Sequence, residues 1–460
     1  MDKTNLTFLL IYFLVIILLT TFIKKPKDIK EYLSGNQNLG YISMALSISA
    51  TWIWAPALFV SAEKSYINGY AGLMWFVLPN ILCLLLFIPF AIKIRKQNPD
   101  GYTLSNYIGR RYDKKVKGIY ITQLSLLAVL STVVQLVAGG KIISLMTGIP
   151  FVYTSIILGG VALIYSLNKG IKASVFTDAI QMIMILAVVF LLVPLLIKNN
   201  GVEPIFNGFN GVNNDTTFFN DKGWQLFLAF GIPTTIGLIA GPFGDQNFYQ
   251  RIFSVKEDKI KHSMVLASIF FAIVPIGMGL IGFMASGIGF RVSDTSIVNF
   301  ELVEAVLPAS MSIVFMFILL SGLLSTIDSN LNSFSALSND VIKNADMRTL
   351  KYAMVLLTVV SLILSNIDLG IVDLFLIYGI LRATTFGTTI ATLLGVKLNS
   401  NGVFYGVLVA LVIGVPTFVI GKMIDNLALT IFASIFTLVI SFLIAYIYTK
   451  IKGVVINANN

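Results

Sequence analysis

A stretch of hydroxyl-bearing side chains lies inside an otherwise apolar part of the chain. Residues 321–333 read Ser-Gly-Leu-Leu-Ser-Thr-Ile-Asp-Ser-Asn-Leu-Asn-Ser. On a helix, Ser325 and Ser329 share one face, and Gly322 lies about one turn before Ser325. Oxygen atoms beside a residue that has no side chain suit the binding of a hard cation. The alternative is close helix packing, for which Gly, Ser and Thr are also enriched.

Asp328 stands in the middle of this hydroxyl stretch. If the segment crosses a membrane, a carboxylate at this place is costly and usually serves a function. Asp328 therefore argues against packing alone. A position near the cytoplasmic end of the segment is the alternative that the sequence leaves open.

The composition indicates that this segment does cross a membrane. Of 460 residues, 57% are hydrophobic and only 12% are charged, against about 25% charged in an average soluble protein. The apolar residues form blocks that approach the roughly 20 residues a membrane-spanning helix needs. We expect an all-α polytopic membrane protein with about thirteen spans: 6–23, 41–62, 72–92, 119–146, 150–166, 173–197, 225–249, 263–287, 310–341, 352–367, 369–396, 403–421 and 426–449.

Two of these spans contain residues that interrupt helices. In span 41–62, residues 49–56 read Ser-Ala-Thr-Trp-Ile-Trp-Ala-Pro. Span 225–249 has Gly-Ile-Pro at 231–233, then Gly237 and Gly-Pro-Phe-Gly at 241–244. A proline removes one backbone hydrogen bond of a helix. Paired interruptions five spans apart, in helices of opposite direction, are typical of inverted-repeat transporters. A simple kink in each helix is the alternative.

The interruptions predict how the single transmembrane domain is organised. We place one five-helix repeat at 41–197 and the other at 225–396. An extra helix at 6–23 precedes them, and two extra helices at 403–450 follow. Each repeat then begins with a broken helix, whose unpaired carbonyls and amides can bind a cation or an anionic group of a substrate.

The basic residues predict the orientation. With the N-terminus outside, twenty-four of the 32 basic residues fall in inner loops and the tail, and six fall outside. Such a bias over short loops places the basic side in the cytoplasm. We therefore expect a multi-pass protein of the cell (plasma or inner) membrane, with its N-terminus outside and its C-terminus in the cytoplasm. The net charge of +10 is assigned to these loops rather than to nucleic-acid binding.

Several classes of function are disfavoured. A single cysteine and a single histidine exclude disulfides within the chain and a metal centre rich in either residue. There is no room for a soluble catalytic domain and no phosphate-binding loop motif. Energy for transport must then come from an ion gradient. We expect no enzyme activity and no cofactor, with the coupling ion as the only ligand besides the solute.

Three stretches resemble the sodium:solute symporter family, which includes sodium/proline and sodium/sugar carriers. They are Gly170–Gln181, with its Thr-Asp pair; Leu324–Ser329, with its paired hydroxyls; and Asp-Gln at 245–246 followed by Tyr-Gln-Arg at 249–251. The resemblance extends over nearly the whole chain. It implies a LeuT-like core and sodium-coupled symport by alternating access.

The resemblance also implies a sodium site. It would use the carbonyls of Ala50, Ile53 and Gly322 and the hydroxyls of Ser325 and Thr326. No transition metal is implied.

A second cation position is known in some relatives of this family. It would use Asp178 with Ser329 here, and Asp328 stands beside it. The ion stoichiometry therefore stays open. The alternative for Asp178 is a carboxylate stabilised by the N-terminus of its helix.

The substrate is the least defined part of the resemblance. The run at 50–55 and the Asp245-Gln246 run are similar to those of urea-type active transporters, although Ile53 and Pro56 depart from the pattern. Urea or a small amide is one expectation, and an amino acid, an organic acid or a sugar is the other. The candidate substrate-binding residues are Trp52, Trp54, Gln135, Asp245 and Gln246.

Some of these roles have alternatives. Gln135 would contact substrate or, alternatively, bond a neighbouring helix. Arg382, inside span 369–396, would pair with an anionic substrate or with Asp373, or extend toward the inner surface. Proton coupling in the same fold and a membrane solute sensor are the alternative functions. Besides the solute, the sodium ion and the lipid bilayer, we expect no partner, and a functional monomer.

Overall fold

The computed structural model describes residues 3–167, 170–212, 216–342, 345–367 and 370–454. These residues form helices and no strand; one isolated bridge joins Leu39 to Val255. The helices of the first half are α1 (Lys3–Thr21), α2 (Ile29–Ser34), α3 (Tyr41–Trp52), α4 (Ala55–Leu58), α5 (Val60–Gln97), α6 (Leu104–Gly109), α7 (Lys114–Thr147), α8 (Phe151–Ser166), α9 (Gly170–Asn200) and α10 (Glu203–Asn207).

The second half continues the bundle. Its helices are α11 (Asp221–Leu226), α12 (Ile232–Ile239), α13 (Gly241–Gly244), α14 (Gln246–Ser254), α15 (Ile260–Gly287), α16 (Val298–Val306), α17 (Ala309–Val341), α18 (Met347–Leu364), α19 (Ile371–Leu394), α20 (Ser400–Val409), α21 (Val415–Met423) and α22 (Leu427–Lys452). Single π-helical turns join α11 to α12 and α20 to α21.

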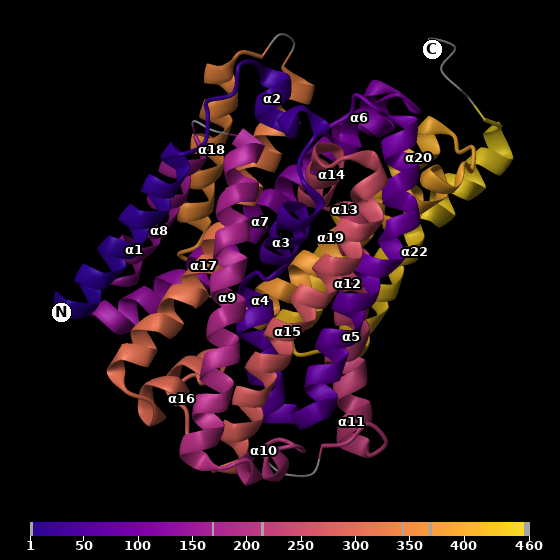
Figure 1. Ribbon diagram of the computed structural model, residues 1–460. Helices are drawn as coiled ribbons and strands as arrows, with labels where there is room; N and C mark the ends of the chain where they lie inside the picture. The colour runs from indigo at the N-terminus through magenta and orange to yellow at the C-terminus, as the bar shows by residue number, and fades with distance from the viewer. Residues whose placement is uncertain (1–2, 168–169, 213–215, 343–344, 368–369, 455–460) are drawn as a thin grey trace.

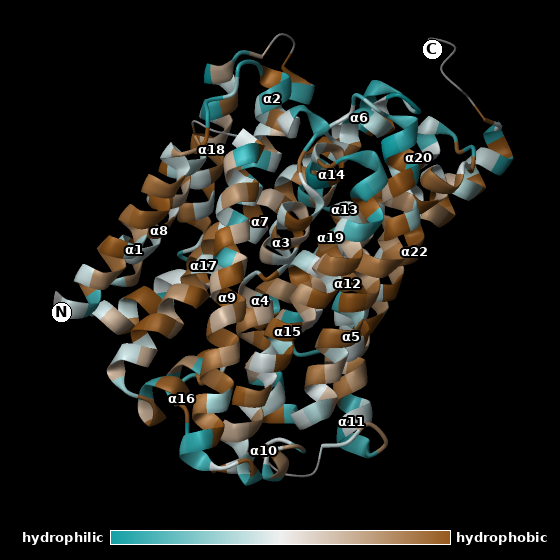
Figure 2. Ribbon diagram, viewed as in Figure 1, coloured by the Kyte–Doolittle hydropathy of each residue, from teal (hydrophilic) through white to brown (hydrophobic). Residues whose placement is uncertain are grey.

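Ten stretches of helix in the described ranges are long and apolar enough to cross a membrane. The other three expected spans are α8, with 16 residues, and the two interrupted stretches α3–α4 and α12–α14. The multi-pass architecture is confirmed, and the number of thirteen crossings stays a prediction. Figure 2 shows hydrophobic ribbon through the middle of the bundle and more hydrophilic ribbon toward both ends.

The long helix α5 turns sharply at Gly69, where φ is 58°. The carbonyl oxygen of Phe209 would lie 2.3 Å from a Cβ at this position. Only glycine combines this backbone conformation with so close an approach. The turn lies between the expected spans 41–62 and 72–92, and α5 takes in the last residues of the first span and the whole of the second.

The broken helix α3–α4 lies at the centre of the bundle. α3 contacts α9, α15 and α17, and α4 contacts α5, α7 and α19. The interrupted stretch α12–α14 contacts α19 and α5. The C-terminal helices α20–α22 cover α19 from one edge, as the right side of Figure 1 shows. The predicted interruptions therefore lie in the interior rather than on the lipid face.

One end of the bundle carries α2, α6 and α14, and the opposite end carries α10, α11 and α16 (Figure 1). We call the first the basic end, because ion pairs link its basic loops to acidic partners. Lys172 at the start of α9 bonds to Glu31 at 2.5 Å, and Lys30 bonds to Asp100 at 3.3 Å. These contacts bring together loops that the orientation argument places on one side of the membrane.

A loop at the basic end ties α14 to α17. Ser105 donates to Oδ2 of Asp340 at 2.6 Å, Thr103 donates to the same oxygen, and Lys117 bonds to the Asp340 carbonyl at 3.1 Å. From α14, Gln246 donates to the Tyr102 carbonyl at 2.8 Å. This loop, residues 102–105, therefore fastens two central helices to each other.

Candidate functional site

The first interruption lies between α3 and α4. α3 ends at Trp52, the Ile53 backbone leaves the helical region (φ −83°, ψ 67°), and Trp54 is extended (ψ 179°). Pro56 falls in the first turn of α4, where a proline costs no helical hydrogen bond. The proline therefore begins the second half of the broken helix.

Gln135 of α7 closes this interruption. Its Oε1 accepts a hydrogen bond from the Ala55 amide at 2.8 Å, and its Nε2 donates to the Ser131 carbonyl at 2.9 Å. The side chain is fully buried. In this conformation Gln135 positions the start of α4, which is the helix-bonding alternative. Its contact with substrate stays a prediction.

The second interruption lies later than the first glycines of its span. The Gly-Ile-Pro run at 231–233 continues as helix after a π turn, and the chain departs from helix at Asp245 (φ −122°, ψ 119°). Oδ1 of Asp245 caps α14 by accepting from the Asn247 amide at 3.0 Å. Gly237 instead lets α12 approach Gly379 of α19, where an added Cβ would lie 2.5 Å from the Gly379 Cα.

Residues expected to bind sodium meet where α3 ends against α17. An added Cβ on Gly322 would lie 2.8 Å from the Ile53 carbonyl oxygen. The Thr326 hydroxyl bonds to the Gly322 carbonyl at 3.1 Å and lies 3.3 Å from the Thr51 carbonyl. Ala50 is buried in the last turn of α3. Oxygen atoms of both helices thus gather in one buried place, as a hard cation needs.

Asp178 of α9 accepts hydrogen bonds from three side chains. Ser325 bonds to Oδ1 at 2.5 Å, while Ser47 at 2.6 Å and Arg251 Nη2 at 2.9 Å bond to Oδ2. Arg251 Nε also donates to Ser47 at 3.0 Å, and Nη2 donates to Ser329. The two charged side chains are 1% and 0% exposed. A guanidinium therefore lies among the residues expected to hold a second cation.

Arg251 is a site residue that sequence reasoning missed. It was part of the Tyr-Gln-Arg run, but no local spacing connects it to Asp178, 73 residues away. Asp178 lies more than two turns inside α9, beyond the first turn in which a helix N-terminus stabilises a carboxylate. The ion pair thus replaces the helix-terminus alternative.

Asp328 has one carboxylate oxygen in use. Ser166 donates to Oδ1 at 2.6 Å and Asn332 donates to it at 2.8 Å, whereas Oδ2 has no hydrogen-bond partner among the described residues. The residue is 1% exposed. A buried bare carboxylate oxygen is expensive unless a cation or a proton satisfies it. Asp328 is thus buried against other helices, and its depth in the membrane stays a prediction.

A second buried ion pair joins the other interruption to α19. Nη2 of Arg382 bonds to Oδ2 of Asp245 at 2.8 Å, and the Tyr378 hydroxyl donates to the same oxygen at 2.7 Å. Arg382 is 2% exposed and Asp245 is 5% exposed. Asp373, the expected protein partner of Arg382, instead bonds to Lys422 at 3.1 Å.

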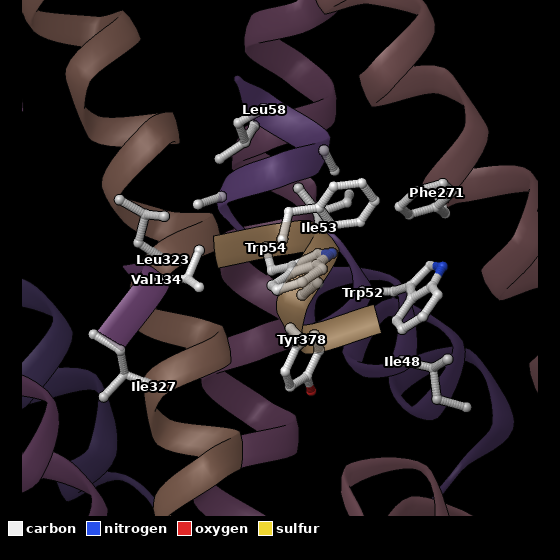
Figure 3. Close-up of a cluster of buried hydrophobic side chains, with 14 of the residues drawn as sticks. Ile48, Trp52, Ile53, Trp54, Leu58, Val134, Phe271, Leu323, Ile327 and Tyr378 are labelled. Carbon is white, nitrogen blue, oxygen red and sulfur yellow. The ribbon is translucent and has the colours of Figure 1, made fainter. Parts of the chain in front are cut away.

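The two tryptophans leave the first interruption in different directions, as Figure 3 shows. Trp54 packs on Tyr378, with ring centroids 4.8 Å apart, and Trp52 packs toward Phe271 at 6.3 Å. The Arg382 guanidinium carbon lies 4.8 Å from the Trp52 ring centre and 5.4 Å from that of Trp54. Both tryptophan rings therefore lie near the Arg382 guanidinium, although the two side chains leave the backbone in different directions.

Gln246 lies apart from this cluster. Its Nε2 bonds to the Tyr102 carbonyl at 2.8 Å and its Oε1 accepts from the Leu104 amide at 3.0 Å. In this conformation the amide serves the loop at the basic end. Of the expected substrate residues, the structure brings together Trp52, Trp54 and Asp245.

An apolar groove between α7, α19 and α20 does not suit a polar solute. It has a volume of about 870 Å³ and is lined by residues of α7, α19 and α20, with almost no polar surface. The neighbouring exposed side chains, such as Leu126 and Val412, are apolar. We assign this groove to the lipid-facing surface.

Comparison with known proteins identifies relatives. The sequence pattern of the sodium:solute symporter family matches residues 32–410. A sodium/pantothenate symporter of Haemophilus influenzae is 25% identical over 338 residues, covering 69% of this chain and 67% of that protein. Probable urea active transporter 1 of Schizosaccharomyces pombe is 28% identical over 148 residues, which are 32% of this chain and 22% of that protein. The latter match thus spans about a fifth of its relative.

Solved structures share the fold. A sodium-coupled sialic acid symporter in a substrate-bound outward-open state has a TM-score of 0.80 at 15% identity, covering 97% of this chain and 98% of that one. Mhp1, a nucleobase-cation-symport-1 family transporter in a closed conformation with bromovinylhydantoin bound, has a TM-score of 0.60 at 15% identity and covers 91% and 95%. These likenesses confirm the expected LeuT-like fold.

Proposed function

The chain belongs to the sodium:solute symporter family, and from this premise we propose that it couples uptake of a small polar organic solute to sodium by alternating access. The observation that carries the proposal is the meeting of Gly322 with the Ile53 carbonyl, beside the Thr326 hydroxyl. We place the protein in the cell membrane, with the basic end in the cytoplasm and the N-terminus outside. It acts as a monomer in this proposal.

Sodium would bind between the interrupted α3–α4 and α17 and stabilise the outward-open state. One charge moved through 100 mV is worth about 2.3 kcal/mol, and a tenfold sodium gradient adds about 1.4 kcal/mol. For a solute without net charge, their sum of about 3.7 kcal/mol sustains roughly a 500-fold gradient; for a monovalent anion carried with one sodium ion, the sodium gradient alone sustains about a tenfold one. One ion per cycle is therefore sufficient for accumulation.

We propose that one sodium ion moves per solute. Arg251 Nη2 already lies between Oδ2 of Asp178 and Ser329. A sodium ion placed there would meet a guanidinium in the same small volume, and like charges at such a distance repel strongly. A Hill coefficient for sodium near one supports this stoichiometry, and a value near two contradicts it.

The test of sodium coupling is radiolabelled uptake into proteoliposomes with and without an inward sodium gradient. The solutes are urea, several amino acids, organic acids, sialic acid and sugars. Ser325→Ala/Thr326→Ala removes both expected hydroxyl ligands. Ser335→Ala/Ser338→Ala is the matched control, because its two hydroxyls lie on the same helix, away from the interruption. Sodium-driven uptake lost only in the first variant supports the proposal.

Asp328 favours one rival, proton coupling, because its Oδ2 has no partner among the residues that the structure describes. A proton would satisfy this oxygen as well as a cation would. Uptake that follows a pH gradient, ignores sodium and is lost in Asp328→Asn would establish the rival. Uptake that requires sodium at every pH and survives Asp328→Asn would exclude it.

A further inference from the structure

The Arg382 guanidinium has more hydrogen-bond donors than the protein satisfies. Nη2 bonds to Asp245 and Tyr378, but Nε and Nη1 have no partner in the described part of the chain. They carry three N–H groups between them. Since the side chain is 2% exposed, these donors are also largely hidden from bulk water. A buried charged donor without a hydrogen-bond partner is costly, so a ligand that supplies acceptors would be bound favourably here.

The neighbourhood of Arg382 offers further donors and few acceptors. Trp54 Nε1 is buried and also lacks a partner among the described residues, and its ring lies 5.4 Å from the guanidinium carbon. Asp245 is already in use, because Oδ1 caps α14 and Oδ2 receives two side chains. Two buried acceptor oxygens nearby, Asn80 Oδ1 and Gln123 Oε1, also lack a partner within the described ranges, and neither bonds to Arg382. The four unpartnered N–H groups of Arg382 and Trp54 outnumber these two oxygens.

The position of Arg382 matches a solute site between the two interruptions. An added Cβ on Gly241 would lie 3.4 Å from Arg382 Nη1 and 2.5 Å from the Trp52 ring. The glycine thus lets Nη1 and an indole lie directly against the second interrupted helix. On the other side, Trp54 belongs to the first interruption. Arg382 is held where both repeats meet, which is where transporters of this architecture bind solutes.

We infer that the solute is a small carboxylate, whose anionic group binds the unpartnered N–H groups of Arg382 while its body packs among Trp52, Trp54 and Tyr378. This inference rests on the proposed function and narrows its substrate class. A carboxylate supplies only acceptors, which is what an excess of donors requires. Urea supplies four N–H donors and one acceptor, so it leaves most of its own donors without partners here.

The charges agree with this assignment. Arg382 and Asp245 together are neutral, so a bound carboxylate leaves one negative charge in the buried site. A sodium ion at the neighbouring interruption of α3 compensates that charge. Carboxylate and sodium therefore favour each other's binding, and the pair crosses the membrane without net buried charge on the ligands. The same reasoning gives a neutral amide no electrostatic gain from sodium.

The first experiment compares pairs of solutes that differ only in charge. Proteoliposomes with an inward sodium or potassium gradient receive radiolabelled acetate and acetamide, propionate and propionamide, benzoate and benzamide, together with pantothenate, urea, glucose and proline. We expect sodium-driven uptake of at least one carboxylate, and at least tenfold slower uptake of its amide. Equal uptake of acid and amide overturns the inference.

The second experiment changes the cation. Arg382→Gln is expected to slow uptake of the preferred carboxylate at least tenfold, whereas Arg382→Lys keeps the preference for acid over amide with a raised KM. The control is Arg291→Gln, at an exposed arginine in the loop between α15 and α16. Because Arg382→Gln leaves Asp245 buried and unpaired, we add Asp245→Asn/Arg382→Gln, which removes both charges together. In this double variant the acid-to-amide ratio is expected to fall at least tenfold.

The outcomes separate this inference from the proposed function. Sodium-driven uptake of urea or glucose, with none of any carboxylate, overturns the carboxylate assignment and leaves sodium symport standing. A retained acid preference in a folded double variant also overturns it. No sodium-driven uptake of any solute counts against both proposals.

Discussion

Replacing Gly322 by alanine tests the sodium site most directly. The added Cβ would lie 2.8 Å from the Ile53 carbonyl oxygen and 3.0 Å from a Leu58 methyl carbon. Ordinary contacts begin near 3.4 Å, so the carbonyl must retreat by roughly half an ångström. Metal–ligand distances tolerate only about 0.2 Å. We expect the sodium concentration for half-maximal uptake to rise at least tenfold, which corresponds to about 1.4 kcal/mol.

Stability and sodium affinity should respond differently to this change. Alanine favours a helix over glycine by up to ~1 kcal/mol, while overpacking costs about 1–3 kcal/mol. The two effects offset each other in part, so the variant should still fold. At saturating sodium, the KM for solute should stay near the wild-type value, because the added Cβ meets Ile53 and Leu58 and no proposed solute-binding residue.

The control for Gly322→Ala is Gly160→Ala. No atom lies within 4 Å of an added Cβ at Gly160 on α8, so this variant gains helix propensity without a clash. The assay is sodium-activated uptake in proteoliposomes, with melting temperature as the folding check. A folded Gly322→Ala protein with unchanged sodium activation would refute the assignment of the Ile53 and Gly322 carbonyls to sodium.

Three further predictions address the charged and packed groups. Arg251→Gln leaves a buried carboxylate unpaired and should lower stability by about 3–5 kcal/mol; adding Asp178→Asn should restore part of it, and thermal unfolding of both variants measures this. In Gly241→Ala, the added Cβ would lie 2.5 Å from the Trp52 ring and force the ring to move. In uptake assays, the KM for solute should then rise while sodium activation stays unchanged. The hydrogen bond from a lysine and one from a backbone amide lower the pKa of Glu31 from 4.5. The stability from this ion pair is then present above pH 4.5 and lost as the pH falls through the lowered pKa, so Glu31→Gln should flatten the acid limb of the melting-temperature profile; an identical acid limb contradicts it.

The sequence predicted features that depend on local composition. The two interrupted helices were predicted from Pro56 and from the Gly-Pro-Phe-Gly run before Asp245. Such residues act on the backbone within a few positions, so the sequence alone reveals them. The hydroxyl stripe of α17 follows from helical periodicity. The exact places of the two interruptions differ from the prediction: Pro56 lies in the first turn of α4, and the second helix is interrupted at Asp245.

The pairing of buried charges could not be predicted in the same way. Arg251 meets Asp178 across 73 residues, and Arg382 meets Asp245 across 137 residues. Such pairs depend on how helices are arranged in three dimensions, which no local pattern encodes. Arg382 had three alternatives in the sequence; the structure pairs Asp373 with Lys422, adds Asp245 as an unexpected partner of Arg382, and leaves two of its nitrogens for the anionic-substrate alternative.

In the proposed cycle, we expect the loop at residues 102–105 to resist the separation of α14 from α17. One carboxylate, that of Asp340, receives donors from Thr103 and Ser105, while Gln246 holds the same loop from α14. If α14 moves away from α17 at this end, the loop must give up either its bonds to Gln246 or its bonds to Asp340. We therefore expect the opening of the solute-loaded transporter toward the cytoplasm to be the slow step of the cycle. Asp340→Asn should then speed exchange across the inner mouth while weakening the retention of solute.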